Sequence, residues 1–354
     1  MSWVGKIVVR RITVLAAGAA VVVAVAAASF AVGRGGRVHE PVAKADRTKA
    51  ADIELTTGTI PSGTPTPIQP PAAPRALADS PERTGIATVA GPACPNPDAL
   101  GVSRVVEIDT TGGPGFGFEQ FKAHDFLEPG EIVLTFDDGP WPAHTPAVLA
   151  ALAAHCVKAT FFPIGKHATW HPEILKQVVA QGHTIGSHTW SHVDLARKPV
   201  ADAKDEIEKG ISAVAISAGR PLAPFFRFPA LRMTPELTAY LAERNIGIFS
   251  TDMDSFDFKI KKPDQVVLSV MTKLKKRGKG IILMHDFQQS TANALPELLV
   301  QLKAGGYKVV QLKAKDTVVT LPQYDAAMAK AQSGQTTDGR PTASVVRTIT
   351  GYSN

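Results

Sequence analysis

The sequence contains very little cysteine: Cys94 and Cys156 are the only two among 354 residues. Two thiols exclude a disulfide-dense scaffold and a zinc module built from several cysteine pairs. The chain also lacks a Gly-x-Gly-x-x-Gly segment after an expected strand, and it lacks a Walker phosphate-binding loop. The two common sequence signatures of nucleotide binding are therefore missing.

Net charge is scarce over most of the chain. The whole sequence has 38 Lys+Arg and 32 Asp+Glu, a formal charge of +6. Residues 1–37 hold five basic residues and no acidic one, so residues 38–354 carry a net charge of only +1. A near-neutral chain offers no basic surface for a phosphate backbone, and we expect no nucleic-acid partner. The hydrophobic fraction of 44% is that of a globular protein.

Charged residues are absent from residues 12–33. As a helix, these 22 residues would be about 33 Å long, enough for a hydrocarbon core of about 30 Å. Signal-peptide cores usually span only about 7–15 residues, so we expect residues 1–33 to be a signal anchor that contacts the membrane through residues 12–33. The alternative is a signal peptide cleaved near the small residues 26–28, followed by secretion. Either way, the remaining chain is expected on the extracytoplasmic, periplasmic side.

Aromatic residues are absent between Phe30 and Phe116, and eight prolines fall between Pro61 and Pro92. Such a segment cannot bury enough apolar surface to fold alone, and its prolines keep it extended. We therefore predict a disordered linker at residues 34–93. The small and polar residues 317–354 are predicted to be a poorly ordered tail.

Residues 94–316 alternate between short apolar runs and segments of helical period, which is typical of a single domain with a parallel sheet and covering helices. Seven strands are predicted, at residues 132–136, 159–162, 184–185, 225–228, 246–249, 281–284 and 308–310. Six helices are predicted, at residues 146–155, 172–181, 200–218, 235–244, 264–275 and 291–304. Periodicity does not decide between a barrel and a doubly wound sheet.

Ionisable side chains follow five of these strands, where active sites of β/α folds are built. They are Asp137, Asp138, His188, His192, Arg227, Asp254, Asp257 and His285. One carboxylate and two imidazoles can bind a metal and leave positions open for water and substrate. On a helical turn, His188 and His192 would face the same way. A second carboxylate and a further histidine can serve as base and acid, which together fit a metal hydrolase.

Five segments resemble the motifs of the NodB-homology polysaccharide deacetylases, carbohydrate esterase family four. They are TFDDGP at residues 135–140, SHTWSH at 187–192, RFP at 227–229, DSFDF at 254–258 and LMH at 283–285. The resemblance covers roughly residues 95–316 and implies a distorted (β/α)7 barrel. It also implies a divalent metal, zinc first and Co²⁺ or Ni²⁺ as alternatives, bound by Asp138, His188 and His192.

The resemblance assigns the catalytic roles as well. Asp137 is expected to be the base, and Arg227 is expected to pair with it. His285 is expected to be the general acid, oriented by Asp254. On the substrate side we expect Leu283, Phe258, Asp257 and the backbone N–H of Ala230. The family usually has Tyr or Trp where this chain has Ala230, and Trp where it has Phe258, so the substrate groove departs from the family pattern.

The expected function is metal-dependent removal of N-acetyl groups from a polysaccharide or oligosaccharide, of peptidoglycan or chitin-like type. The alternatives are an O-acetyl esterase acting on an exopolysaccharide, and a non-catalytic, membrane-tethered glycan-binding domain. A non-haem Fe(II) oxygenase shares the ligand types, but its usual His-x-Asp/Glu pair on a β-sandwich is absent from this sequence. The sequence leaves the oligomeric state open.

The two cysteines fit an extracytoplasmic location. If the domain lies outside the cytoplasm, Cys94 and Cys156 can pair and fix the start of the domain to the end of its first helix. The alternative is a buried free thiol at Cys156.

Overall fold

The computed structural model describes residues 88–90, 94, 96–336 and 339–346, all within one unit of the chain, Ala76–Asn354. The predicted membrane segment at residues 12–33 and most of the predicted linker lie outside the described residues. Within the part of the chain that is described, no helix has both the length and the apolarity needed to cross a bilayer.

All seven predicted strands are present in the structure. They are β4 (Glu131–Asp137), β5 (Thr160–Phe162), β6 (Thr184–Ile185), β7 (Phe225–Phe226), β8 (Gly247–Phe249), β10 (Gly280–His285) and β11 (Lys308–Ala314). Four further short strands were not predicted: β1 (Thr88–Ala90), β2 (Arg104–Ile108), β3 (Gly115–Phe116) and β9 (Met253–Asp254). Strand β1 corrects the prediction that all of residues 34–93 form a linker, because it pairs antiparallel with β2.

Strand β4 lies at the centre of an eight-stranded sheet. It pairs in parallel with β10 along one edge, and with β11 and then β5 along the other. Strand β6 continues from β5, and a bridge between Ser187 and Phe226 connects it to the three-stranded sheet β3-β8-β7. Because these pairings are parallel, the carboxyl ends of β4, β5, β6, β7 and β10 point the same way.

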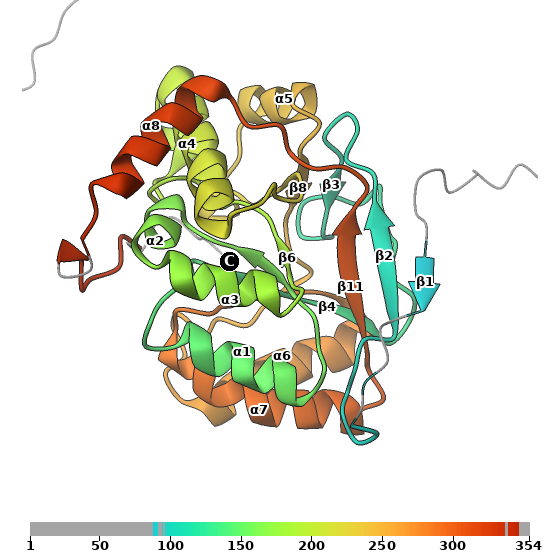
Figure 1. The fold of residues 1–354 in the computed structure, drawn as a ribbon. Helices are drawn as coiled ribbons and strands as arrows, with labels where there is room; N and C mark the ends of the chain where they lie inside the picture. Colours follow the sequence, from blue (N-terminus) through green and yellow to red (C-terminus); the bar gives the residue numbers. More distant parts are fainter. Residues whose placement is uncertain (1–87, 91–93, 95, 337–338, 347–354) are drawn as a thin grey trace, which may run out of the picture. The chain divides into compact units, whose positions relative to one another are not determined.

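The helices cover the strands in two groups (Figure 1). Helix α7 (Gln289–Ala304) contacts both α1 (Thr145–Ala154) and α6 (Pro263–Arg277). Helix α4 (Val200–Ala218) contacts α2 (Gly165–Trp170), α3 (Pro172–Ala180) and α5 (Pro235–Glu243). Helix α8 (Pro322–Ser333) also lies against α4. This helix corrects the prediction of a poorly ordered tail at residues 317–354.

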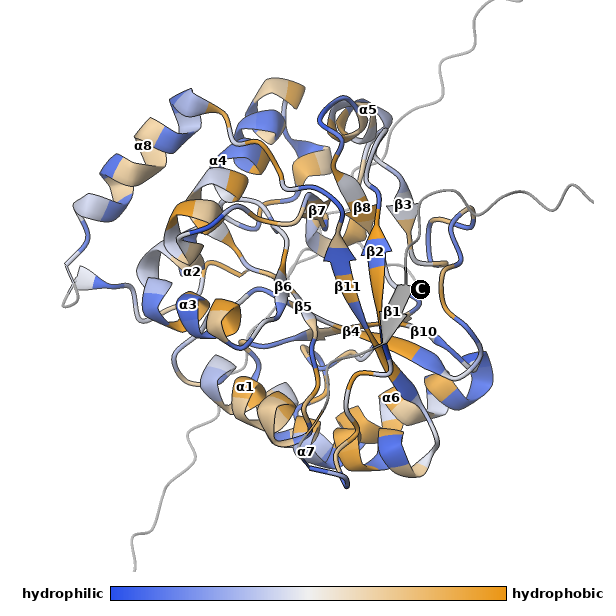
Figure 2. Ribbon diagram, turned by 45° about the vertical axis from the view of Figure 1, so that its right-hand side comes forward, coloured by the Kyte–Doolittle hydropathy of each residue, from blue (hydrophilic) through white to orange (hydrophobic). Residues whose placement is uncertain are grey.

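Strand β4 is buried on both faces, which is typical of a parallel sheet covered by helices. Ile132, Leu134 and Phe136 belong to the larger apolar cluster, which includes buried residues of α1, α6 and α7. Val133 faces the other way, into a smaller cluster with Phe162 and other residues of the strands. Figure 2 shows that strand β10, which pairs with β4, is also largely hydrophobic, whereas helix α8 mixes hydrophobic and hydrophilic residues.

Candidate active site

Successive side chains of β4 point to opposite faces of the sheet, and this determines which of them reach the interior enclosed by the strands. Thr135 and Asp137 lie on the same face as Val133, because side chains two residues apart share a face. His285 ends β10, and its Cα lies opposite that of Asp137 in the sheet register. The two strands therefore deliver a carboxylate and an imidazole to the same end of the sheet.

Arg227 follows β7 and is fully buried beneath Asp137. One guanidinium nitrogen, Nη1, lies 2.8 Å from Asp137 Oδ1 and donates a second bond to Thr135 Oγ1. The other two nitrogens donate to the carbonyl groups of Phe249 and Ser250, and the guanidinium stacks 4.4 Å from the Phe162 ring. All three nitrogens of this buried cation are therefore paired, as burial of a charge requires.

Burial raises the pKa of Asp137 to about 6, although the positive charges of Arg227 and His285 act in the opposite direction. A carboxylate with this pKa is ionised near neutral pH and still accepts a proton readily. That combination suits a general base.

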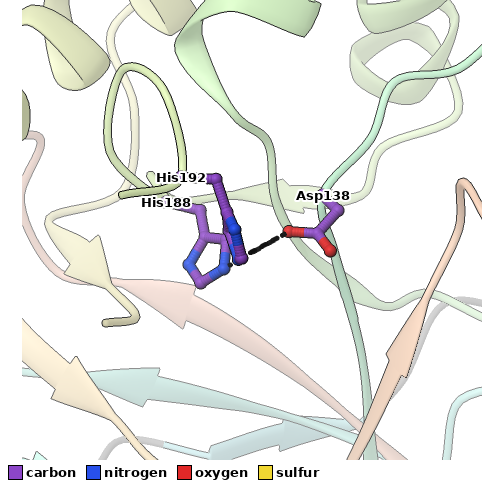
Figure 3. A group of neighbouring side chains, drawn as sticks. All are labelled: Asp138, His188 and His192. Carbon is purple, nitrogen blue, oxygen red and sulfur yellow. Dashed lines mark ion pairs between the residues drawn. The ribbon is translucent and has the colours of Figure 1, made fainter. Parts of the chain in front are cut away.

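Asp138, His188 and His192 form a three-residue cluster whose potential ligand atoms all lie within 4.8 Å of one another (Figure 3). Asp138 Oδ1 is 3.4 Å from His188 Nε2 and 3.3 Å from His192 Nε2. Ligands about 2.0–2.1 Å from a tetrahedral zinc ion would be about 3.3 Å apart, so this spacing fits a metal. Among the described residues, the buried Asp138 Oδ1 also has no hydrogen-bond partner.

The tautomer of His188 is fixed by its surroundings. Its Nδ1 donates to the Arg227 carbonyl group at 2.7 Å, which leaves the lone pair of Nε2 directed toward Asp138. Burial, followed by the charge of His192, lowers the pKa of His188 to about 3. A neutral imidazole with its second nitrogen hydrogen-bonded is the usual form of a metal-binding histidine.

The two histidines do not lie on a helical turn, which corrects the geometry inferred from their spacing. Residues 188–192 form a loop in which Thr189 and His192 have left-handed backbone conformations, at φ 69° and 54°. The Thr189 hydroxyl accepts a hydrogen bond from the His192 N–H at 3.0 Å. This compact loop brings the two rings together, with their centroids 5.0 Å apart.

His285 is held by Asp257, whereas the sequence predicted Asp254. His285 Nδ1 lies 2.6 Å from Asp257 Oδ1, and its backbone N–H donates to Asp257 Oδ2 at 2.7 Å. Asp254 instead accepts a hydrogen bond from the Phe256 N–H at 2.8 Å. The prediction also placed Asp257 at the substrate, but this side chain is fully buried, and Thr291 donates a further bond to it.

The carboxylates around His285 raise its pKa to about 10. Burial opposes the charged form, but the charge and hydrogen bond of Asp257, followed by the charges of Asp138 and Asp137, have the larger combined effect. His285 is therefore protonated at neutral pH in this site, and its Nε2 lies 4.0 Å from Asp138 Oδ2. A protonated imidazole at this position is a ready proton donor.

The three other residues predicted at the substrate lie around His285 or after Arg227. Leu283 is buried on the same face of β10 as His285, and the Phe258 ring packs edge-on against His285 with centroids 5.6 Å apart. Ala230 is partly exposed and has a left-handed backbone at φ 50°. These placements leave an apolar side chain and an aromatic ring beside the proton donor.

Two buried residues that were not predicted from the sequence hold the loop after β4. Asp286 accepts hydrogen bonds from the Gly139 N–H at 3.0 Å and from the Thr145 hydroxyl at 2.6 Å. A methyl group on Gly139 would lie 2.0 Å from Asp286 Oδ2, so this contact requires glycine. His167 Nδ1 lies 2.5 Å from the Asp138 carbonyl oxygen. An acidic residue directly after the strand-ending His285 was the available sequence signal for Asp286.

The chain is similar to known proteins in both sequence and structure. Residues 127–247 match the family model described as polysaccharide deacetylase. A peptidoglycan-N-acetylglucosamine deacetylase of Listeria monocytogenes is 33% identical over 184 residues, covering 51% of this chain and 38% of that protein. A chitooligosaccharide deacetylase of Bradyrhizobium is 31% identical over 192 residues, covering 50% of this chain and 87% of that protein. The solved structure of a Bdellovibrio bacteriovorus peptidoglycan deacetylase has a TM-score of 0.56 at 32% identity and covers 65% of each chain.

The parallel α/β fold and this site are those of the polysaccharide deacetylases that the chain resembles. The chain belongs to the polysaccharide deacetylase family, carbohydrate esterase family four. It spans 38% of the length of the Listeria relative, so the match covers one part of that protein.

Proposed function

We propose that this protein is a metal-dependent deacetylase that hydrolyses N-acetyl groups on a glycan of the peptidoglycan or chitin type and releases acetate. The observation that carries the proposal is the meeting of three units at one end of the sheet. These units are the Asp138, His188 and His192 cluster, the Asp137–Arg227 pair and the Asp257–His285 pair. We likewise interpret the parallel strands of the two sheets as the distorted (β/α)7 barrel of the family.

Zinc is the proposed metal, with Co²⁺ and Ni²⁺ as alternatives, because a carboxylate and two imidazoles are its common ligands. When bound, a zinc ion lowers the pKa of water to about 7 and polarises a carbonyl group. Asp137 would accept the proton of the attacking water, while Arg227 keeps that carboxylate ionised. His285 would then donate its Nε2 proton to the departing amine, and Asp257 holds the ring through Nδ1. The Ala230 N–H is the proposed donor to the developing oxyanion.

The test is a screen for acetate release by the zinc-loaded protein. The substrates are peptidoglycan, acetylated chitooligosaccharides, an O-acetylated exopolysaccharide and a small acetyl ester. Release from an N-acetylated glycan, abolished by a chelator and restored by zinc, supports the proposal. Release from O-acetyl substrates alone identifies an esterase. If the protein binds a glycan but releases acetate from no substrate, the result supports the alternative of a non-catalytic glycan-binding domain.

We also propose that the domain works on the extracytoplasmic side of the membrane, anchored through residues 12–33 or secreted after cleavage. The support is the disulfide between Cys94 and Cys156, because disulfides persist in oxidising compartments. Protease added to intact spheroplasts should cut the domain, seen as fragments on a reducing gel, while a cytoplasmic marker stays intact. Survival of both proteins until lysis would contradict this location.

A further inference from the structure

The chain after β11 returns to the active-site side of the fold. Helix α8 lies against α4, and Figure 1 shows the red end of the chain running on from α8 toward α2. Arg340 forms an ion pair with Glu173 of α3, at 2.7 Å. Residues 344–346 then reach α2 itself.

Two groups of this returning segment contact one imidazole nitrogen. The Val345 backbone N–H donates to His167 Nε2 at 3.2 Å, and Ser344 Oγ lies 3.1 Å from the same nitrogen. Ser344 Oγ also accepts a hydrogen bond from the Val346 N–H at 3.0 Å. The backbone thus occupies one acceptor position of the hydroxyl, and the hydroxyl proton is available to the imidazole.

The other nitrogen of His167 contacts a proposed metal ligand. His167 Nδ1 lies 2.5 Å from the Asp138 carbonyl oxygen, and the ring is completely buried. A carbonyl oxygen can only accept, so Nδ1 carries the proton and Nε2 accepts from Val345 and Ser344. The contacts on both sides of the ring thus select the same neutral tautomer.

The backbone that His167 holds is strained. Asp138 has a left-handed conformation at φ 74°, which is unfavourable in a residue other than glycine and persists only when its surroundings fix it. The Asp138 N–H donates to the Phe162 carbonyl group over a longer distance, 3.3 Å. The short bond from His167 is therefore a main restraint on the peptide that carries the Asp138 carboxylate.

We propose that His167 is a positioning residue for Asp138, and that Ser344 and Val345 form a strap that fixes the tautomer and place of His167. This proposal deepens the proposed function and rests on it for the identity of the metal site. The C-terminal segment thereby sets the metal affinity of a site formed about 150 to 200 residues earlier in the chain. Outer partners of metal ligands typically change metal affinity or activity by about 10–100-fold when they are replaced.

The experiment uses full-length protein and replaces the two sides of the imidazole separately. His167→Asn keeps an amide donor near the Nδ1 position, and His167→Gln keeps an amide near the Nε2 position. The strap variant, Ser344→Ala with Val345→Pro, removes both donors without shortening the chain. His171→Gln is the matched control, because His171 is also buried and its ring also packs against Trp141, without a contact to Asp138.

The measurements are zinc affinity by chelator competition, the visible spectrum of the Co²⁺ form, and thermal unfolding. We expect His167→Gln to lose about 10–100-fold in zinc affinity and to change the Co²⁺ spectrum. The strap variant and His167→Asn should each lose about 2–10-fold, the equivalent of one or two hydrogen bonds. Combining these two changes should add no further loss, because both act through the same contact. His171→Gln should bind zinc like wild type.

Wild-type zinc affinity in His167→Gln, or no zinc binding by the wild-type protein, would overturn the inference. Equal losses in all variants including His171→Gln, in step with lower unfolding temperatures, would show only a packing role and also overturn it. The expected affinities together with no acetate release by wild type would leave the inference standing and refute the proposed function.

Discussion

At the residue scale, two opposing effects determine the pKa of Asp137, the proposed base. Burial raises the pKa of Asp137, and the ion pair with Arg227 limits that rise. Because every guanidinium nitrogen of Arg227 is hydrogen-bonded, this cation cannot turn away to another partner without leaving a buried donor unpaired.

Replacing Asp137 with Asn separates proton transfer from metal binding. Asp137→Asn should lower the rate of acetate release by about 10²–10⁴-fold, because general-base catalysis contributes about this much. Zinc affinity should remain close to wild type, since the metal cluster uses Asp138, His188 and His192. A steady-state assay and a chelator-competition titration check the two parts. Retained activity in Asp137→Asn would contradict the assignment of the base.

The Asp257–His285 pair should give a pH-dependent contribution to folding in the metal-free protein. His285 has a folded pKa of about 10 against an ordinary value of 6.5, so its proton stabilises the fold fully below pH 6.5. This stabilisation is lost as the pH rises toward 10. The difference in unfolding free energy between wild type and His285→Gln should therefore shrink between pH 7 and pH 10, as measured by urea unfolding in EDTA.

His183 supplies the control for that measurement. Burial lowers the pKa of His183 to about 3, so this side chain is neutral in the folded protein and mostly neutral in the unfolded protein from pH 7 to pH 10. The difference between wild type and His183→Gln should stay constant over the same range. A constant difference for His285→Gln as well would show that its proton does not stabilise the fold.

At the element scale, helices α4 and α5 are joined by a buried carboxylate. Glu208 of α4 accepts bonds from Arg244, at the end of α5, and from the Tyr240 hydroxyl. Its side chain is 1% exposed, against 17% for Arg244. Because water cannot replace the lost partner at such a site, each donor matters to the unfolding free energy.

Arg244→Met should destabilise the protein by about 3–5 kcal/mol, because it leaves Glu208 buried without its cation. Lys209→Met removes an exposed ion pair with Asp205 on the same helix and should cost only about 0–1 kcal/mol. Chemical unfolding of both variants measures the contrast. Equal and small losses would show that Glu208 does not depend on Arg244.

Seven of the eleven described strands and six of the eight described α-helices could be predicted from the sequence, whereas contacts between loops could not. Apolar runs such as residues 281–284 identify a buried strand whatever its neighbours are. Helix α8 was missed because Met328 is its only buried residue, and one apolar position gives no helical period. Asp254 ends β9, and Asp257 follows it by three residues. Only the β9–β10 register and the contact with Thr291 determine which of the two reaches His285.

The candidate site also divides into residues that the sequence pattern predicts and residues that only the contacts reveal. Its residues follow parallel strands, and active sites of β/α folds lie at the carboxyl ends of such strands. This alone predicted that Asp137, Asp138 and His285 lie at one end of the sheet. His167 lies on the short helix α2 and acts through a backbone carbonyl group, which leaves no pattern in the sequence. Its partners Ser344 and Val345 fall in the region that was predicted as a poorly ordered tail.

At the scale of the whole molecule, one covalent link joins the start of the described domain to the end of α1. Cys94 and Cys156 are 62 residues apart and form a disulfide. In the chain-entropy model, a loop of this length stabilises the folded state by about 4 kcal/mol. Cys94→Ser with Cys156→Ser should lower the unfolding free energy by about that amount, as measured by chemical unfolding. No difference from the oxidised wild type would contradict a structural role for the bond.

The disulfide also changes what a protease can achieve. The exposed residues 122–125 lie inside the covalent loop, between β3 and β4. A cut after Lys122 would break the backbone on the amino side of Asp137, yet both fragments would stay joined through Cys94 and Cys156. Such a clipped molecule would run as a single band on a non-reducing gel and as two bands with reductant. Wherever the domain meets such a protease, a cut at this site would therefore nick the chain without separating the two fragments.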